Sequence, residues 1–279
     1  GVKRHQVDNA RKLFERWQTL LAGNHAPGDD VDRAKDRGVA RRVLVLDHCT
    51  PTPDQDAGSI TALNLMLMFR QAGFQVTFAA EDNFVYMPGY TLALQRAGIE
   101  VLYAPYVTSV RQHLERAGGR YDVVLMFRPG VAQRHLDSVR ALCGGAKIVY
   151  HSSDIHFLRM QREAALTQSA SIASDAADMR ARELGYVAAA DAVIVHSTAE
   201  RDLLQELAPG SNVCVFQWAI PIRGTEAGFG QRSDIVFVGG YQHPPNADAA
   251  IHFVQDIFPR IRARLPAVKF LAVGSNPPA

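Results

Sequence analysis

Cysteine is rare in this chain of 279 residues. Its three cysteines are odd in number and far apart, at Cys49, Cys143 and Cys214. This distribution excludes a disulfide framework and a CxxC metal site, and it favours the reducing environment of the cytoplasm. The histidines and cysteines form no group with metal-ligand spacing. We therefore expect a metal-free chemistry without a bound cofactor.

An excess of one charge and long apolar runs are also missing. Lysine and arginine together number 30 against 28 aspartates and glutamates, which gives a formal net charge of +2. Charges this nearly balanced argue against nucleic acid as a partner. Apolar runs stop well short of the roughly 20 residues that span a bilayer. The GxSxG and P-loop patterns are absent too, which excludes serine hydrolases and P-loop nucleotidases of the usual kind.

Residues 1–40 are predicted to form an amphipathic helix and a charged linker. Apolar side chains recur at helical spacing over residues 7–21 and include Trp17. The segment that follows mixes glycine, proline and alternating charge, which is typical of a linker. The helix is basic over its first half, so peripheral contact with the inner membrane is one interpretation and docking on another domain is the alternative.

Residues 41–222 are predicted to form one α/β domain. Short β-branched apolar runs alternate with helical patterns, and connections of that length require parallel strands with right-handed crossovers. The expected strands lie at residues 42–48, 74–80, 99–105, 121–127, 146–152, 191–197 and 212–221. The predicted fold class is therefore α/β, with a doubly wound, mostly parallel Rossmann-like sheet and ligands beyond the carboxyl ends of its strands.

The start of a second Rossmann-like domain is predicted for residues 223–279. A strand at 233–240, a helix at 244–265 and a strand at 268–275 repeat the α/β pattern. Roughly 50 residues are too few to complete such a domain, because one helix and two strands leave much apolar surface uncovered. We expect this domain to be truncated and the natural protein to continue at both ends.

The densest group of reactive side chains follows the predicted strand at 146–152. It consists of His151, Ser152, Ser153, Asp154, His156, Arg159 and Arg162. A carboxylate beside a histidine can orient a hydroxyl or fix one imidazole tautomer, and arginines one turn further on can bind phosphate. The structural alternative is a helix N-terminus that Asp154 caps, with a solvated basic face.

The loop after the first strand holds a second candidate. Gly58 lets the backbone approach a ligand, and a helix N-terminus at Ser59 favours an anion such as phosphate. A tight turn, with Ser59 capping a helix that begins at Ile60, is the structural alternative. A full GxGxxG is absent, so a nicotinamide oxidoreductase has little support.

Three weaker candidates lie at other strand ends. Arg128 follows the predicted strand at 121–127, and its structural alternative is a surface arginine. His196 closes the predicted strand at 191–197, and its structural alternative is a strand-end histidine without a ligand. A helix capped by Ser197 or Thr198 comes next. Gly239 and Gly240 end the first strand of the second domain, where a glycine pair permits close passage of a diphosphate and Asn246 is placed to cap the next helix.

Four segments, in this order, resemble bacterial glycosyltransferases of family four, which have the GT-B fold. They are residues 44–83, with DQDAGS, residues 148–164, with HSSDIHFLR, residues 193–204, with VHSTAER, and residues 235–274, with VGGYQHPPN. The resemblance implies two facing Rossmann-like domains with chemistry between them. Residues 41–222 would be the acceptor-side domain, and residues 223–279 would open the donor-binding domain.

The resemblance also implies roles for single residues. Asp154 and His156 match the family's Asp-x-His segment as the catalytic pair. Substrate and donor contacts are expected, by family position or by their place at strand ends, from Gly58, Ser59, Arg128, Arg159, Gly239 and Gly240. The family often has a Tyr-Asp-x-x-Asp-x-His pattern, whose first aspartate is His151 here, so the role of His151 stays open.

The implied activity is sugar transfer with retention of configuration and without a bound metal. The donor would be a nucleotide sugar and the acceptor a saccharide or a lipid-linked molecule, in cell-envelope polysaccharide synthesis. The family's Arg/Lys pair and Glu-x7-Glu element would lie beyond Ala279, so we expect this chain alone to be inactive. Two alternatives are an epimerase or hydrolase of nucleotide sugars with the same architecture, and a non-catalytic carbohydrate-binding module.

Overall fold

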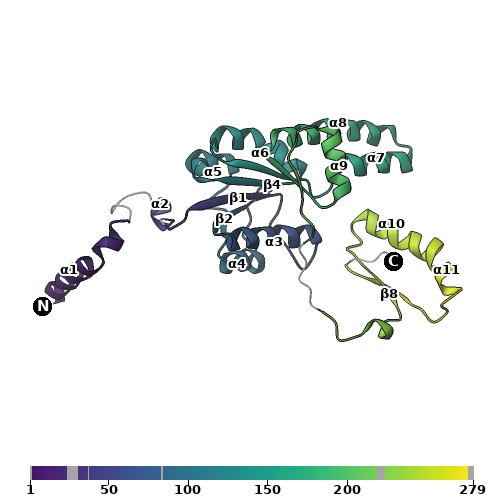
Figure 1. Cartoon of the computed structure of the whole chain (residues 1–279), viewed down its shortest axis with the longest axis horizontal. Helices are drawn as coiled ribbons and strands as arrows, with labels where there is room; N and C mark the ends of the chain where they lie inside the picture. The colour runs from purple at the N-terminus through teal and green to yellow at the C-terminus, as the bar shows by residue number, and fades with distance from the viewer. Residues whose placement is uncertain (1, 24–30, 37, 83, 219–223, 276–279) are drawn as a thin grey trace. The chain divides into compact units, whose positions relative to one another are not determined.

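The computed structural model describes residues 2–23, 31–36, 38–82, 84–218 and 224–275 (Figure 1). The chain forms two compact units. The first comprises Gly1–Cys49 and Met66–Val215, and the second comprises Thr50–Leu65 and Phe216–Ala279.

The first unit contains a seven-stranded parallel sheet. Its strands lie in the order β3-β2-β1-β4-β5-β6-β7, and every hydrogen-bonded pair is parallel. The strands are β1 (Arg41–Asp47), β2 (Phe74–Ala80), β3 (Glu100–Leu102), β4 (Val123–Phe127), β5 (Lys147–His151), β6 (Ala192–Val195) and β7 (Val213–Val215). The predicted doubly wound α/β fold is confirmed, and the strand order reverses between β1 and β4.

Helices cover both faces of this sheet. They are α4 (Pro88–Arg96), α5 (Val110–Ala117), a 3-10 turn η1 (Gly118–Arg120), α6 (Arg128–Leu142), α7 (His156–Thr167), α8 (Ala170–Ala189) and α9 (Thr198–Leu207), with the last part of α3 (Ala57–Gln71). Figure 1 shows α5, α6 and α8 on one face and α4 on the other. Val43, Leu44, Val45 and Leu46 are all fully buried, as expected for a central parallel strand with both faces covered.

Two hydrophobic clusters anchor the helices to the sheet. In the first, Leu44 and Met126 pack with Leu114 of α5 and Val139 of α6. In the second, Tyr150 and Val193 pack with side chains of α7, α8 and α9. These clusters fix the ends of β4, β5 and β6, from which the candidate site is built.

The first unit differs from the prediction in two details. The predicted linker contains a short helix, α2 (Val31–Lys35), and Lys35 contacts Glu100 at the start of β3. The strand expected at 212–221 ends at Val215 in the described part, and its expected end at Pro221 lies outside the described residues. The predicted N-terminal helix is present as α1 (Val2–Leu21).

The apolar stripe of α1 is exposed. Phe14, Trp17 and Leu20 are 59%, 44% and 69% exposed. In the ranges that the structure describes, no helix combines the length and the apolar character needed to cross a membrane.

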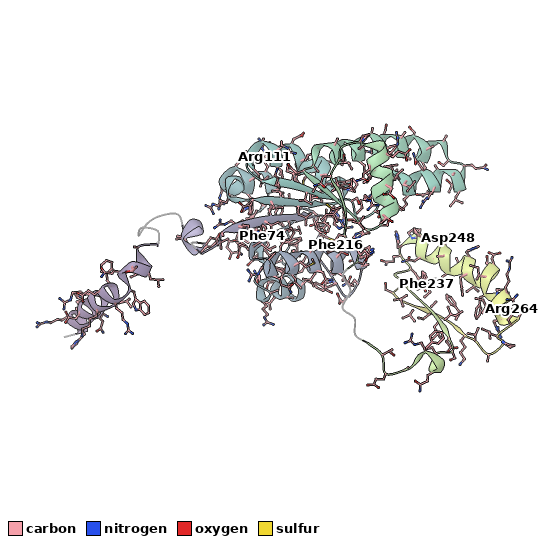
Figure 2. All side chains as sticks on the ribbon, viewed as in Figure 1. Phe74, Arg111, Phe216, Phe237, Asp248 and Arg264 are labelled. Atoms are coloured by element: carbon pink, nitrogen blue, oxygen red, sulfur yellow. The ribbon has the colours of Figure 1, made fainter. Side chains whose placement is uncertain are left out.

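The second unit contains two parallel strands, β8 (Ile235–Val238) and β9 (Phe270–Val273). A 3-10 turn, η2 (Phe229–Gln231), precedes them. The helix predicted at 244–265 is present in three parts: α10 (Pro244–His252), a π-helical turn η3 (Phe253–Ile257) and α11 (Phe258–Arg262). The break follows from Pro259, which has no backbone N–H for a regular helical hydrogen bond. Phe237 and Arg264, both labelled in Figure 2, belong to this unit.

Candidate active site

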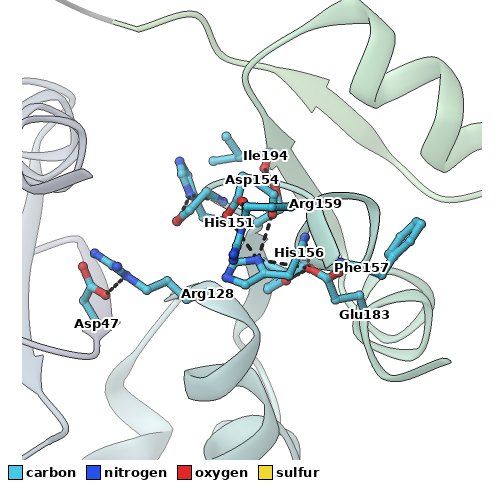
Figure 3. Close-up of polar contacts among 12 residues, drawn as sticks. Asp47, Arg128, His151, Asp154, His156, Phe157, Arg159, Glu183 and Ile194 are labelled. Carbon is cyan, nitrogen blue, oxygen red and sulfur yellow. Dashed lines mark hydrogen bonds and ion pairs between the residues drawn. The ribbon is translucent and has the colours of Figure 1, made fainter. Parts of the chain in front are cut away.

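Asp47 and Arg128 meet where the strand order of the first unit reverses. Asp47 ends β1, and Arg128 directly follows β4 as the first residue of α6. Arg128 Nε donates to Asp47 Oδ1 at 3.0 Å, and the His48 amide donates to the same oxygen at 2.7 Å (Figure 3). Burial raises the pKa of Asp47, while Arg128 and the His48 amide oppose the rise. The pair places a guanidinium, 36% exposed, at the carboxyl edge of the sheet.

Two residues at this edge have left-handed backbone conformations. Arg128 has φ of 71° and Ser153 has φ of 65°. Such angles cost a non-glycine residue about 1 kcal/mol or more, and they gather at functional sites because the surrounding structure must impose them. One follows β4 and the other follows β5, so the strain lies where the topology predicts ligands.

His151 ends β5 and is buried against two other rings. Its imidazole stacks on Phe127 with a centroid distance of 4.4 Å and meets the His196 ring edge-on at 5.0 Å. The Ser153 amide donates to His151 Nδ1 at 3.1 Å, so the proton of the neutral ring lies on Nε2. Nε2 is buried and has no hydrogen-bond partner among the described residues.

The environment of His151 keeps its ring uncharged. Burial lowers the pKa of His151 to about 3, and the nearby His196 and Arg128 add to that effect. The imidazole is therefore neutral at physiological pH and presents an N–H donor without taking up a proton.

The start of α7 carries a charged group a few residues further on. Asp154 Oδ1 lies 3.2 Å from His156 Nδ1, and Arg159 Nε donates to Asp154 Oδ2 at 2.9 Å (Figure 3). Burial alone lowers the pKa of His156, but the hydrogen bond to Glu183 and the charges of Asp154 and Glu183 outweigh it and raise the pKa. The structure therefore brings Asp154, His156 and Arg159 together as predicted neighbours, with the histidine favoured as a cation.

Glu183 is the member of this group that sequence reasoning missed. This buried side chain comes from α8, where it accepts hydrogen bonds from the amides of His156 at 3.2 Å and Phe157 at 2.8 Å. Its carboxylate also accepts from the Tyr150 hydroxyl at 3.5 Å. The sequence did contain a signal for this role. Glu183 falls on the same helical stripe as Ala176 and Val187, which are buried, and a carboxylate on a buried stripe needs hydrogen-bond partners.

The structural alternative, in which Asp154 caps the helix, is wrong. Helix α7 begins at His156, and its N-cap residue is Ile155, whose side chain makes no capping hydrogen bond. Glu183 already accepts from the first two amides of the helix. Asp154 is therefore left for His156 and Arg159. By contrast, Ser197 caps α9 as predicted, in a capping box with Glu200.

A second polar group lies beside Asp47 at the ends of β1 and β2. Glu81 accepts from Arg134 Nε at 2.6 Å and also contacts Arg134 Nη2. His135 Nε2 and His48 Nδ1 lie 3.2 and 3.5 Å from the same carboxylate. Burial raises the pKa of Glu81, but Arg134 and His135 outweigh it, so the pKa lies below its usual value. Glu81 is thus paired with the guanidinium of Arg134.

Gly58 and Ser59 lie in the second unit, at the start of α3. The helix begins at Ala57 and not at Ile60, so the predicted Ser59 cap is wrong. Asp56 accepts from the Ser59 amide at 2.8 Å and from its hydroxyl at 2.6 Å. Aspartate is a strong N-cap, and it brings a carboxylate to the end of the helix where an anion was expected.

Gly239 and Gly240 also lie in the second unit, after β8. A Cβ atom on Gly239 would lie 2.9 Å from Asn246 Nδ2, which donates to the Gly240 carbonyl at 3.0 Å. A larger residue at position 239 would therefore have to displace the Asn246 side chain. The predicted cap is wrong here as well, since the N-cap of α10 is His243 and Asn246 lies within its first turn.

The carboxyl edge combines groups suited to a hydroxylated, anionic substrate. Arg128 and Arg159 offer guanidinium groups for phosphate. His156 and Asp154 can hold or move a proton at a hydroxyl. Among the described residues, no group of three or more His, Cys, Asp or Glu side chains is arranged to bind a metal ion.

Comparison with known proteins supports the fold. No protein-family model matches the chain, and no curated protein sequence matches it. Among solved structures, the chain is similar to sucrose-phosphate synthase from Thermosynechococcus elongatus, with a TM-score of 0.58 and 12% identity. The similarity covers 85% of this chain and 63% of that one, so the chain spans less than two thirds of the neighbour's length.

A second solved structure is similar at a TM-score of 0.38. It is UGT73P12 from Glycyrrhiza uralensis, complexed with glycyrrhetinic acid 3-O-monoglucuronide, with 10% identity over 63% of this chain and 48% of that one. At 12% identity, the similarity to the sucrose-phosphate synthase concerns the fold alone. The chain has a Rossmann-like α/β fold with a seven-stranded parallel sheet, of the kind found in GT-B proteins.

Proposed function

We propose that this chain is the acceptor-side domain and part of the donor-binding domain of a retaining glycosyltransferase. It would move a sugar from a nucleotide sugar to a saccharide or lipid-linked acceptor, without a bound metal. The observation that carries the proposal is the group Asp154, His156 and Arg159 at the carboxyl edge of the sheet. The similarity in fold to a sucrose-phosphate synthase supports it.

The proposed reaction breaks the bond between the anomeric carbon and the donor diphosphate. The electron pair leaves with the diphosphate oxygen, the acceptor oxygen bonds to the anomeric carbon, and the acceptor proton passes to the departing diphosphate. Negative charge therefore grows on the diphosphate, and fixed positive groups stabilise that change. We assign this role to Arg128 and Arg159, and we assign the positioning of substrate hydroxyls to Asp154 and His156.

The remaining expectations belong to the same proposal. Residues 41–222 would form the acceptor-side domain, and Gly239 and Gly240 would approach the donor phosphates. Membership of family four, a cytoplasmic location beside the inner membrane and a part in cell-envelope polysaccharide synthesis follow from the resemblance of the sequence.

The test is a screen of UDP-, GDP- and dTDP-sugars against the longer protein that contains this chain, with this chain beside it. We expect transfer by the longer protein and at least a hundredfold loss of kcat/KM in Asp154→Ala and His156→Ala. Asp175→Ala is the matched control, because Asp175 is exposed on the neighbouring helix α8.

The other outcomes separate the alternatives. Release of free sugar at the same rate with and without acceptor would indicate a hydrolase. Nucleotide binding without turnover of any donor would favour a binding module. Unchanged transfer in Asp154→Ala and His156→Ala would remove the proposed site.

A further inference from the structure

Helix α1 carries an exposed apolar stripe along one face. Because successive residues of a helix lie about 100° apart, its large exposed apolar side chains fall within an arc of about 140°. They are Val7, Leu13, Phe14, Trp17 and Leu20, and the least exposed of them, Trp17, is still 44% exposed. The stripe extends for about 20 Å along the helix axis. A continuous exposed apolar surface of this kind is typical of a site that contacts a partner.

Positive charge is concentrated in the same helix. The 20 residues of α1 include five lysines and arginines and two acidic residues, an excess of three positive charges. Outside α1, 25 basic and 26 acidic side chains remain from totals of 30 and 28 in the whole chain, which gives a net charge of −1. The five basic residues of α1 are all exposed and are Lys3, Arg4, Arg11, Lys12 and Arg16.

The basic side chains lie on both sides of the stripe. At helical spacing, Arg4 and Arg11 fall on one side of it, and Lys12 and Arg16 fall on the other side. The two acidic residues occupy the face opposite the stripe. Arg11 Nε lies 3.9 Å from Glu15 Oε1, but these side chains are 67% and 64% exposed, so the guanidinium stays accessible. A flat anionic surface that meets the stripe would therefore meet positive charge along both of its sides.

The aromatic residue of the stripe lies beside one of these cations. The Arg16 guanidinium carbon is 5.5 Å from the centroid of the Trp17 ring. Indole has an apolar body and one polar N–H group, which suits it to the level of lipid head groups. Arginine can lay its apolar stem along such a surface while its charged end stays in water. Together they form a pair suited to the boundary between water and lipid.

We propose that α1 binds the surface of a bilayer that contains anionic phospholipids. The stripe would enter the boundary between head groups and acyl chains, and the flanking basic side chains would contact lipid phosphates. A second copy of α1 fits less well, because like charges would face each other beside the stripe and its arc is wider than a coiled-coil seam. The inference uses no residue of the proposed active site and does not depend on sugar transfer.

The test measures co-sedimentation of this chain with vesicles of phosphatidylcholine, with and without about one quarter phosphatidylglycerol. We expect the chain to bind the anionic vesicles at least tenfold more tightly, and high salt should weaken this binding. Phe14→Gln should weaken it at least tenfold, because it removes apolar area from the stripe. Lys12→Glu should weaken it at least fivefold, because it reverses a charge beside the stripe.

Two variants outside α1 are the matched controls. Leu166→Gln replaces an apolar side chain of α7 that is 83% exposed. Arg180→Glu reverses an exposed charge on α8, which has 20 residues like α1. Both should bind the anionic vesicles as the native chain does. A second readout is the emission of Trp17 in a Trp218→Phe background, which should shift to shorter wavelength on binding because the indole leaves water.

Several results would overturn the assignment. Equal binding to both kinds of vesicle, or none to either, would remove the anionic bilayer as the partner. Equal weakening by Arg180→Glu and Lys12→Glu would leave only a general charge effect. Unshifted Trp17 emission in the bound chain would show that the stripe does not enter the bilayer. A dimer that Phe14→Gln dissociates, without vesicle binding, would assign the stripe to a second copy. Because binding is measured without donor or acceptor, failure of the proposed transferase activity does not affect this test.

Discussion

The carboxyl edge of the sheet has a buried aromatic side around His151 and a charged side around His156. On the aromatic side, His151 contacts the rings of Phe127 and His196, and burial lowers its pKa to about 3. On the charged side, His156 lies within 3.5 Å of Asp154 and Glu183, whose charges raise its pKa against the effect of burial. Five positions apart, the same residue type is a neutral donor in one place and a favoured cation in the other.

This difference shows that the charge of a histidine depends on which elements meet around it. Phe127 of β4 and His196, which follows β6, contact His151, whereas α8 supplies the carboxylate beside His156. Burial keeps the His151 ring away from solvent, so the exposed polar groups of the site come from the charged side. The predictions that follow test the two sides separately.

The largest effect is expected from Glu183→Ala on the charged side. This change leaves two amides at the start of α7 and the Tyr150 hydroxyl without their acceptor. Buried groups that lose their partner cost roughly 1–3 kcal/mol each, although water entry reduces the sum. We expect the free energy of unfolding to fall by about 3 kcal/mol, measured by urea denaturation.

Two further variants make the Glu183 result specific. Glu183→Gln retains one acceptor oxygen and should lose less stability than Glu183→Ala. Glu163→Ala, at an exposed position of α7, should change the free energy of unfolding by less than about 0.5 kcal/mol. If Glu163→Ala and Glu183→Ala destabilise equally, Glu183 does not hold the start of α7.

A smaller effect is expected from acid on the aromatic side. The pKa of His151 is about 3 in the folded chain, against about 6.5 when unfolded. The unfolded state therefore binds more protons, and this contribution to stability is lost as pH falls below 6.5. The loss is about 2 kcal/mol between pH 7 and pH 5. His151→Asn keeps an acceptor for the Ser153 amide but does not titrate, so it should lose about 2 kcal/mol less than the native chain.

The acid prediction is measured by urea denaturation at several pH values. His5→Asn, at an exposed position of α1, is the control and should follow the native curve. If the free energy of unfolding depends on pH in the same way in His151→Asn and in the native chain, His151 is not buried as a neutral ring.

The opposite pH dependence is expected for His156. Because its folded pKa is raised, the protonated form is favoured by folding, and this contribution is complete below the unfolded pKa of about 6.5. It is lost as pH rises through the folded pKa. Asp154→Asn removes one of the two carboxylates and should lower the pKa of His156, measured by an NMR titration of the imidazole. Asp175→Asn should leave that pKa unchanged, and an equal pKa in Asp154→Asn and the native chain would exclude the Asp154 contact.

Much of the fold could be predicted from the sequence because the signals are local. Buried parallel strands read as short apolar runs, such as Val43 to Leu46, and long connections force them to be parallel. The group after β5 was found for the same reason, since ligands gather at the carboxyl ends of such strands. The exact helix start was missed at α3, where Asp56 precedes the helix and accepts from Ser59, which lies in its first turn.

Contacts between distant segments could not be predicted in this way. Glu183 lies 27 positions after His156, and its role depends on how α8 packs against α7. A cavity at the amino ends of the strands likewise joins Lys35, Arg42 and Arg120, which no local pattern connects. Opposite pKa shifts at His151 and His156 follow from the same kind of packing and not from their spacing.

The smallest effect on stability is expected from Arg159→Ala, also on the charged side. Arg159 and Asp154 have side chains that are 44% and 46% exposed, and exposed ion pairs contribute at most about 1 kcal/mol. The free energy of unfolding should therefore change by less than 1 kcal/mol. If Arg159 contacts a donor phosphate as proposed, kcat/KM of the longer protein should nevertheless fall more than tenfold. Arg162→Ala, on the same helix, is the control and should change neither the free energy of unfolding nor kcat/KM. A large loss of stability without a specific loss of transfer would make Arg159 a structural partner of Asp154 and not a contact of the donor phosphate.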